Sequence, residues 1–117
     1  MREIRFYRTA GGDSPVRRFL DSLPGEQARK VFWVLRLVEE LERVPARYLK
    51  KLHGTRHLWE IRADFGGEAF RILGFFDDTG SLVVSNGFSK KSERVPAREI
   101  AQAERCRRDY LSRGKYE

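Results

Sequence analysis

The sequence contains one cysteine, two histidines and no long hydrophobic run. Because Cys106 has no second cysteine to pair with, an internal disulfide and a cysteine-rich zinc site are both excluded. No apolar stretch approaches the ~20 residues of a membrane span, and the first residues, MREIRFYR, lack the apolar core of a secretion signal. We therefore expect a protein of the reducing cytoplasm with no membrane partner.

Acidic residues are also in short supply. Asp and Glu number 17 against 24 Lys and Arg, which gives a net charge of +7. This charge favours a polyanionic partner, which can be nucleic acid, an anionic membrane surface or an acidic protein. The length of 117 residues suits one domain over residues 1–117 with one hydrophobic core.

The two histidines make a weak metal motif. His53 and His57 are four residues apart, a spacing that joins two ligands on a helix. Gly54 lies between them in a segment that looks like a loop entering a strand, and no third ligand is near in sequence. We expect no bound metal and no other cofactor.

Local patterns predict an α+β fold. Residues 3–7 alternate apolar and charged side chains, as a short strand does. Ser14-Pro15 predicts the start of a short helix, and apolar residues at helical spacing predict a second helix over about residues 26–43. Residues 47–56 look like a basic loop, and Pro96 can open a C-terminal helix with Ile100, Ala103, Cys106 and Tyr110 as its inner stripe. The predicted order is β-α-α-β-β-β-α, a small, largely antiparallel sheet with two N-terminal helices and a C-terminal helix.

Residues 58–91 look like three consecutive strands joined by two tight turns. Gly66-Gly67 forms the first turn and residues 77–80 form the second. A loop of only Gly66 and Gly67 places Ile61 opposite Ile72, and these two side chains then lie on the core face. The first hairpin therefore has a defined register.

The same register places Arg62 directly opposite Arg71 on the other face, with Glu60 diagonal to Arg71. Two arginines side by side repel by up to about 1 kcal/mol if exposed. One interpretation is an ionic cluster in which Glu60 offsets this repulsion. The other is a functional pair of guanidinium groups that bind a phosphate through bidentate contacts.

The second hairpin extends this face if its loop has four residues. Phe76 then pairs with Ser81 and Arg71 with Asn86, whereas another register would move the last strand to the opposite face. The predicted face is a basic concavity with one aromatic ring, which suits single-stranded RNA. Its members are Arg62, Arg71, Asn86, Phe88 and Lys90, flanked by Lys50, Lys51 and Arg56.

These residues occur in an order that resembles the RelE/ParE superfamily of bacterial type II toxins, in particular its HigB-like, phage-derived branch. The similar pieces cover nearly the whole chain, and their ordered combination is specific where any one alone is weak. They are Leu52-His53-Gly54-Thr55-Arg56, Leu58-Trp59-Glu60-Ile61-Arg62, Phe70-Arg71-Ile72-Leu73, Gly87-Phe88-Ser89-Lys90-Lys91 and Pro96.

The resemblance implies a ribosome-dependent mRNA endonuclease that a cognate antitoxin, most often a helix-turn-helix protein, holds inactive. In such toxins the 2′-hydroxyl attacks the adjacent phosphate without a metal ion. Arg62, Arg71, Lys90 and Lys91 match the motif positions of the family, and Lys50, Lys51 and Arg56 match its basic connector less closely. Fixed cations stabilise the charge that builds on phosphorus.

The group that moves protons is left open by the sequence. Some superfamily members use a C-terminal histidine or tyrosine, but both histidines lie upstream and Tyr110 belongs to the inner stripe of the last helix. Lys90, with a pKa lowered by neighbouring cations, and Glu60 are the candidates for the general base.

Two other functions share these sequence features. The resemblance also covers ParE-type toxins, which inhibit DNA gyrase by binding it, although such an inhibitor has no need of phosphate-binding cations on one face. A basic RNA-binding module without catalysis has the same composition as a nuclease.

Overall fold

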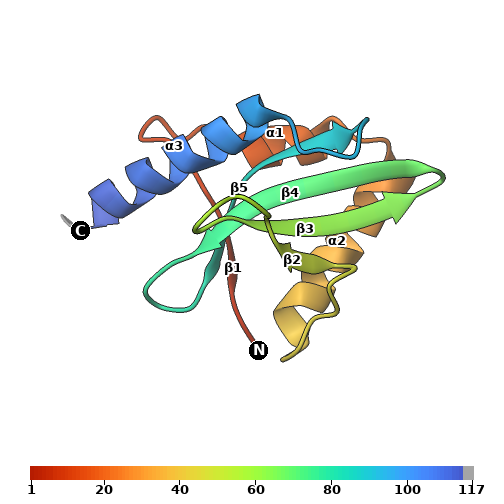
Figure 1. Ribbon diagram of the computed structural model, residues 1–117, viewed down its shortest axis with the longest axis horizontal. Coiled ribbons are helices and arrows are strands. Elements are labelled where there is room, and N and C mark those ends of the chain that lie inside the picture. Colours follow the sequence, from red (N-terminus) through yellow and green to blue (C-terminus); the bar gives the residue numbers. More distant parts are fainter. Residues whose placement is uncertain (115–117) are drawn as a thin grey trace.

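A computed structural model describes residues 1–114 of the chain and shows an α+β domain (Figure 1). Its elements are β1 Ile4–Phe6, α1 Pro15–Asp21, α2 Gly25–Glu40, β2 Leu49–Lys51, β3 Trp59–Phe65, β4 Glu68–Phe76, β5 Leu82–Lys90 and α3 Ala97–Gly114. The strands form one sheet in the order β1-β5-β4-β3-β2. Only the β1–β5 pair is parallel, so the sheet is largely antiparallel, as the sequence predicts.

One strand is missing from the sequence prediction. Residues 47–56 were expected to form a loop, but Leu49–Lys51 is a short edge strand that pairs with Trp59–Ile61. Three residues are too few for an alternation signal, and their adjacent lysines resemble a solvated loop. The order is therefore β-α-α-β-β-β-β-α, and it brings Lys50 opposite Glu60.

The N-terminal helices begin and end for local reasons. The backbone N–H of Arg17 donates to Ser14 Oγ at 3.3 Å, and Pro15 follows as the first helical residue. α2 ends at Glu40, three residues before the predicted end, because Leu41 adopts an extended backbone. The Arg2 guanidinium donates to the Leu41 carbonyl at 2.8 Å and so helps to satisfy this helix end.

The sheet has a hydrophobic core on each face. α1 and α2 cover one face, where Val16, Val34 and Phe70 are almost fully buried. α3 covers part of the other face, with Ala103 and Cys106 against Leu73 and Phe75 in a second cluster. Figure 1 shows α3 along one side of the sheet, away from α2. No helix within residues 1–114 is long and apolar enough to cross a membrane.

The first hairpin has the predicted register. Gly66 and Gly67 have φ of +58° and +81°, as both central residues of a type I′ turn require. Phe65 accordingly pairs with Glu68, and Arg62 pairs with Arg71. This turn fixes which side chains of β3 and β4 lie next to each other.

The second hairpin corrects the predicted register. Phe76 pairs with Leu82, not Ser81, and a bulge then follows between Leu73 and Gly74. Arg71 pairs with Phe88 as a result, not with Asn86. Each shift alone would move β5 side chains to the opposite face, but two shifts of one residue cancel in this respect.

The bulge is stabilised by polar and steric features of its own. Ser85 is the extra residue, and its hydroxyl donates to the Leu73 carbonyl at 3.0 Å. A Cβ at Gly74 would lie 2.5 Å from the Val83 carbonyl oxygen, so only glycine fits there without a backbone shift. The bulge therefore belongs to the native packing.

Candidate nucleic-acid interface

The predicted arginine pair is present on β3 and β4, but it is not free of carboxylates. Glu60 lies between the two guanidinium groups, with Oε1 at 3.4 Å from Arg62 Nε and Oε2 at 3.9 Å from Arg71 Nε. Asp64 adds a contact of 3.1 Å to Arg71 Nη1. The structure therefore contains the ionic cluster that the sequence offers as one interpretation of these residues.

The two arginines differ in what they can contact. The Arg71 side chain is 6% exposed, and the Arg62 side chain is 30% exposed. Buried charges require partners, which Glu60 and Asp64 supply for Arg71. Of the two, only Arg62 therefore offers substantial guanidinium surface to a ligand. Arg71 is buried and contacts the carboxylate of Glu60, which also contacts Arg62.

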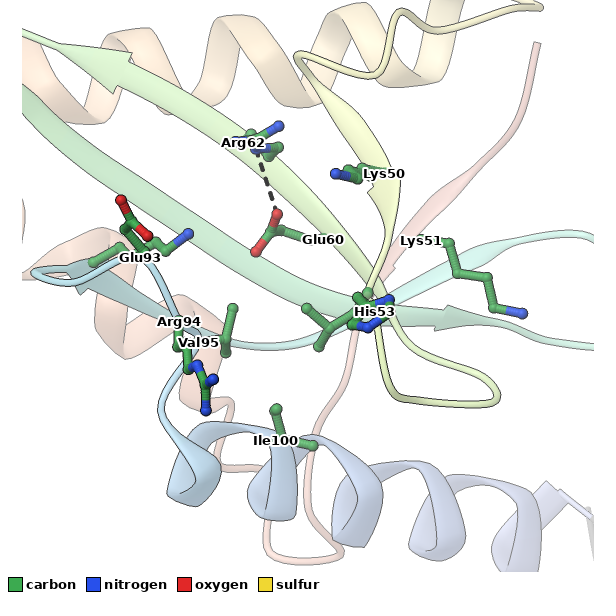
Figure 2. A pocket seen from close by; sticks show the side chains of 11 residues that line it. Lys50, Lys51, His53, Glu60, Arg62, Glu93, Arg94, Val95 and Ile100 are labelled. Atoms are coloured by element: carbon green, nitrogen blue, oxygen red, sulfur yellow. Dashed lines mark ion pairs between the residues drawn. The ribbon is translucent and has the colours of Figure 1, made fainter.

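A cleft of about 620 Å³ opens beside Arg62 (Figure 2). It lies between the β2–β3 side of the sheet and the segment that enters α3. Its lining is Lys50, Lys51, Leu52, His53, Glu60, Arg62, Lys90, Glu93, Arg94, Val95 and Ile100. Five cations thus outnumber two carboxylates, and the volume lies in the range of small-ligand sites.

The two lysines of β2 have different orientations. Lys50 pairs with Glu60 in the sheet register and so shares its face with Arg62. Lys51 pairs with Trp59 on the opposite face, and Figure 2 shows its ammonium pointing away from Glu60. Both lysines line the cleft, but only Lys50 lies on the same face of the sheet as Arg62.

Lys90 occupies the boundary between two hollows. It lines the cleft and also a shallower hollow of about 320 Å³ that contains Arg71 and Lys91. The Lys91 ammonium lies 3.5 Å from a Glu68 carboxylate oxygen and is largely exposed. Lys90 therefore joins the predicted cluster, whereas Lys91 lies at its outer edge.

Asn86 and Phe88 correct the prediction of an open RNA-binding face. Asn86 is 2% exposed and its side-chain amide donates to the Glu99 carboxylate at 3.0 Å, which attaches α3 to the sheet. Phe88 is 9% exposed and packs in the α3-side core. Both lie on the predicted face, but α3 covers them, so the Phe88 ring is not open to a base.

Arg56 lies in the loop between β2 and β3 and is exposed, but it does not line the cleft. Its predicted contact with RNA stays a prediction. Across residues 1–114 no three His, Cys, Asp or Glu side chains come together as a possible metal site, and His53 and His57 lie in the same loop.

A profile described as "Phage derived protein Gp49-like (DUF891)" matches residues 18–108. The chain belongs to this Gp49-like family. The family is a RelE-like, toxin-like family, in agreement with the fold. No curated protein matches the sequence.

The Gp49-like match covers the whole cleft, from Lys50 to Ile100. It ends before Tyr110, whose side chain packs against Phe75 at 5.6 Å between ring centroids and donates to Asp77 at 2.8 Å. Burial raises the pKa of Tyr110, and its bond to Asp77 raises it further. The prediction that Tyr110 belongs to the core is therefore confirmed.

Several cleft residues of this Gp49-like protein are not among the site residues predicted from its sequence. His53 belongs to the family motif and was weighed as a metal ligand but not as a site residue, yet it lines the cleft. Val95 and Ile100 form an apolar wall that is continuous with the α3-side core. The sequence signal for this apolar wall is Leu73 and Phe75, which lie on the same face of the sheet as Arg62 and Arg71. Apolar side chains on that face require a covering element, which here is α3.

Proposed function

We propose that this Gp49-like protein is the toxin of a type II toxin–antitoxin pair of the HigB-like branch, and that it cleaves mRNA on the ribosome in the cytoplasm. The observation that carries the proposal is the convergence of Arg62, Lys50 and Lys90 on one cleft of nucleotide size within a toxin-like family. A polyanion that enters the cleft meets cations from β2, β3 and β5.

The proposed reaction needs no metal ion. The ribose 2′-oxygen forms a bond to the adjacent phosphorus and the bond from phosphorus to the 5′-oxygen breaks, which leaves a 2′,3′-cyclic phosphate and a free 5′-hydroxyl. Addition of water to the cyclic phosphate, with cleavage of its bond to the 2′-oxygen, then gives a 3′-phosphate. Arg62 and Lys90 contact the phosphate oxygens and stabilise the added charge of the transition state. Arg71 is a positioning residue that holds Glu60 and, through it, Arg62.

Two protons move in this reaction. A general base takes the 2′-hydroxyl proton, and a general acid protonates the leaving 5′-oxygen. Glu60 and Lys90 remain the candidates for the base. His53 is a further candidate for the acid because it lies in the same cleft. The pH dependence of cutting by variants at these three positions separates their roles.

The partner that controls such a toxin is a cognate antitoxin, for which a small helix-turn-helix protein is the expected class. A protein of net charge +7 suits an inhibitor with acidic segments. The antitoxin would be encoded in the neighbouring reading frame, so inspection of that frame is the simplest check of this part of the proposal.

The activity is tested with purified protein, ribosomes and a defined mRNA. The parent should cut mRNA only when ribosomes are present, and Arg62→Ala should lower the cutting rate by about 100-fold or more, as loss of one transition-state contact does. Arg98→Ala is the matched control, because this exposed arginine of α3 lies outside the cleft.

The other functions give different results. If replication stops in cells while mRNA stays uncut, the protein is a ParE-like gyrase inhibitor. If the parent binds RNA but never cuts it with ribosomes present, it is a binding module. If Arg62→Ala cuts as fast as the parent, the site is misassigned.

A further inference from the structure

A second cationic surface lies on the side of β2 that faces α2, and it borders the cleft at Lys51. Residues 43–59 contain five Lys or Arg and no Asp or Glu. Of these five, Arg43 and Arg47 lie on the loop between α2 and β2, and Lys51 lies on the strand itself. All three are exposed, and none has a carboxylate partner within 4.0 Å among the described residues 1–114.

Two aromatic rings hold cations in place on this surface. Trp33 of α2 and Tyr48 pack edge to face at 5.8 Å, and Trp33 is 49% exposed. The Arg47 guanidinium carbon lies 4.8 Å from the Tyr48 ring centroid, and Lys30 Nζ lies 4.6 Å from that of Trp33. A guanidinium stacked on a ring keeps its in-plane N–H donors open to a phosphate.

The register places this surface on the opposite face of β2 from Lys50. Lys51 shares its face with Leu49, whose side chain packs against the α2-side core, whereas Lys50 faces the cleft. We call the group Lys30, Trp33, Arg43, Arg47, Tyr48 and Lys51 the β2-edge ridge. A strand of mRNA in the cleft would have to turn around the sheet edge to reach it.

We infer that the β2-edge ridge binds ribosomal RNA and so docks the protein on the ribosome independently of the cleft. The unpaired cations suit RNA phosphates, which contribute a large, salt-dependent part of the affinity. Lys51 of the ridge also lines the cleft, so docking would bring the cleft close to RNA. This inference rests on the proposed function in naming the ribosome as the source of the RNA.

The test is sedimentation with vacant ribosomes, which carry no mRNA, at about 0.1 M salt. The triple variant Lys30→Gln, Arg43→Gln and Arg47→Gln, which leaves every cleft-lining residue in place, should bind about 100-fold more weakly than the parent, and the slope of log affinity against log salt should fall by about two to three units. Arg62→Ala should bind as the parent does, because its change lies in the cleft.

The matched control is Arg98→Gln, Arg105→Gln and Arg108→Gln, which removes the same charge from α3. Figure 1 shows α3 away from β2 and from α2. The control should bind as the parent does. Equal losses in the control and the ridge variant would show a general charge effect and overturn the inference, as would binding that needs mRNA.

The parent protein supplies a test that needs no variant. Ribosomes should protect Lys30 and Lys51 from acetylation by an amine reagent, and unchanged reactivity at both lysines overturns the inference. If the ridge variant binds ribosomes normally but no longer binds a partner protein, the ridge is a protein interface.

Failure of the inference differs from failure of the proposed function. A parent that docks through the ridge but never cuts mRNA leaves the inference standing and removes the nuclease. If the parent cuts mRNA and the ridge variant binds ribosomes as tightly as the parent, the nuclease is supported and the ridge inference is refuted. A parent that does not bind ribosomes refutes both.

Discussion

The carboxylate of Glu60 provides the most informative single substitution, because it affects stability and RNA binding in opposite directions. Its side chain is 7% exposed and lies between Arg62 and Arg71. Glu60→Gln keeps the shape of the side chain and removes its charge. We expect a less stable protein that binds RNA more tightly.

The loss of stability follows from the distances. At an effective dielectric constant of about 20, unit charges at 3.4 Å and 3.9 Å attract by about 5 and about 4 kcal/mol. The net effect is smaller because the variant no longer desolvates a carboxylate, Arg62 regains water and glutamine keeps one carbonyl acceptor. We expect the free energy of unfolding to fall by about 2 kcal/mol, which lowers Tm by about 8 °C.

The gain in RNA binding follows from the same charge. Removal of one carboxylate from a cleft lined by five cations should raise affinity for a single-stranded RNA by about fivefold at 0.1 M salt. Urea unfolding and fluorescence anisotropy with a labelled, non-cleavable oligonucleotide measure the two effects. Unchanged stability, or weaker RNA binding, would refute the account of Glu60 as the charge shared by both arginines.

Asp64 offers a matched control for the stability measurement. It contacts Arg71 at a shorter distance, 3.1 Å, but its side chain is 73% exposed. An exposed ion pair contributes about 1 kcal/mol or less. Asp64→Asn should therefore cost less than half as much as Glu60→Gln, and a larger cost would show that distance matters more than burial here.

Three further outcomes are expected. Gly74→Ala should lower the free energy of unfolding by about 1–3 kcal/mol in urea, because its Cβ would meet the Val83 carbonyl; equal stability would mean that the bulge shifts freely. Burial and the bond to Asp109 raise the pKa of Tyr7 to about 12. The neutral Tyr7 hydroxyl therefore contributes its full stabilisation below pH ~10, and this contribution is lost as pH rises toward about 12. Tyr7→Phe should make the free energy of unfolding fall less steeply with pH in this range, and an unchanged pH dependence would contradict this. Glu93→Gln should tighten RNA binding without changing Tm, and a fall in Tm would show a structural role for Glu93.

The register of the first hairpin could be predicted from the sequence because its turn permits only one loop length. Two consecutive glycines with positive φ fix a two-residue loop, and every pair along β3 and β4 follows from it. The juxtaposition of Arg62 and Arg71 was therefore available from the sequence.

The second hairpin could not be predicted in the same way. Asp77 accepts bonds from the backbone N–H groups of Thr79 and Ser81, and this longer turn displaces the register by one residue. The bulge at Ser85 then displaces it by another. A glycine such as Gly74 is compatible with a bulge but does not fix its position. The predicted face of Lys90 is therefore right only because the register errors at the turn and at the bulge cancel.

The shape of the site depends on which part of the arginine face α3 covers. Leu73, Phe75 and Phe88 share a face with Arg62, and they require apolar cover that the amphipathic α3 supplies. Residue types alone predicted an open basic face with a free aromatic ring. The helix instead buries the ring and leaves the charged half of the face as one wall of the cleft.

Which cations of the site are free to bind a phosphate likewise depends on neighbouring carboxylates, and composition alone does not show which cations those carboxylates contact. Arg71 and Lys91 each lie beside a carboxylate, whereas Lys50 and Lys90 have none within 4.0 Å in the described part of the chain. A count of arginines and lysines therefore overstates what the face offers to a phosphate. The cations that a polyanion meets first are Lys50 on the edge strand β2 and Lys90 at the end of β5, because neither forms an ion pair with a carboxylate among the described residues.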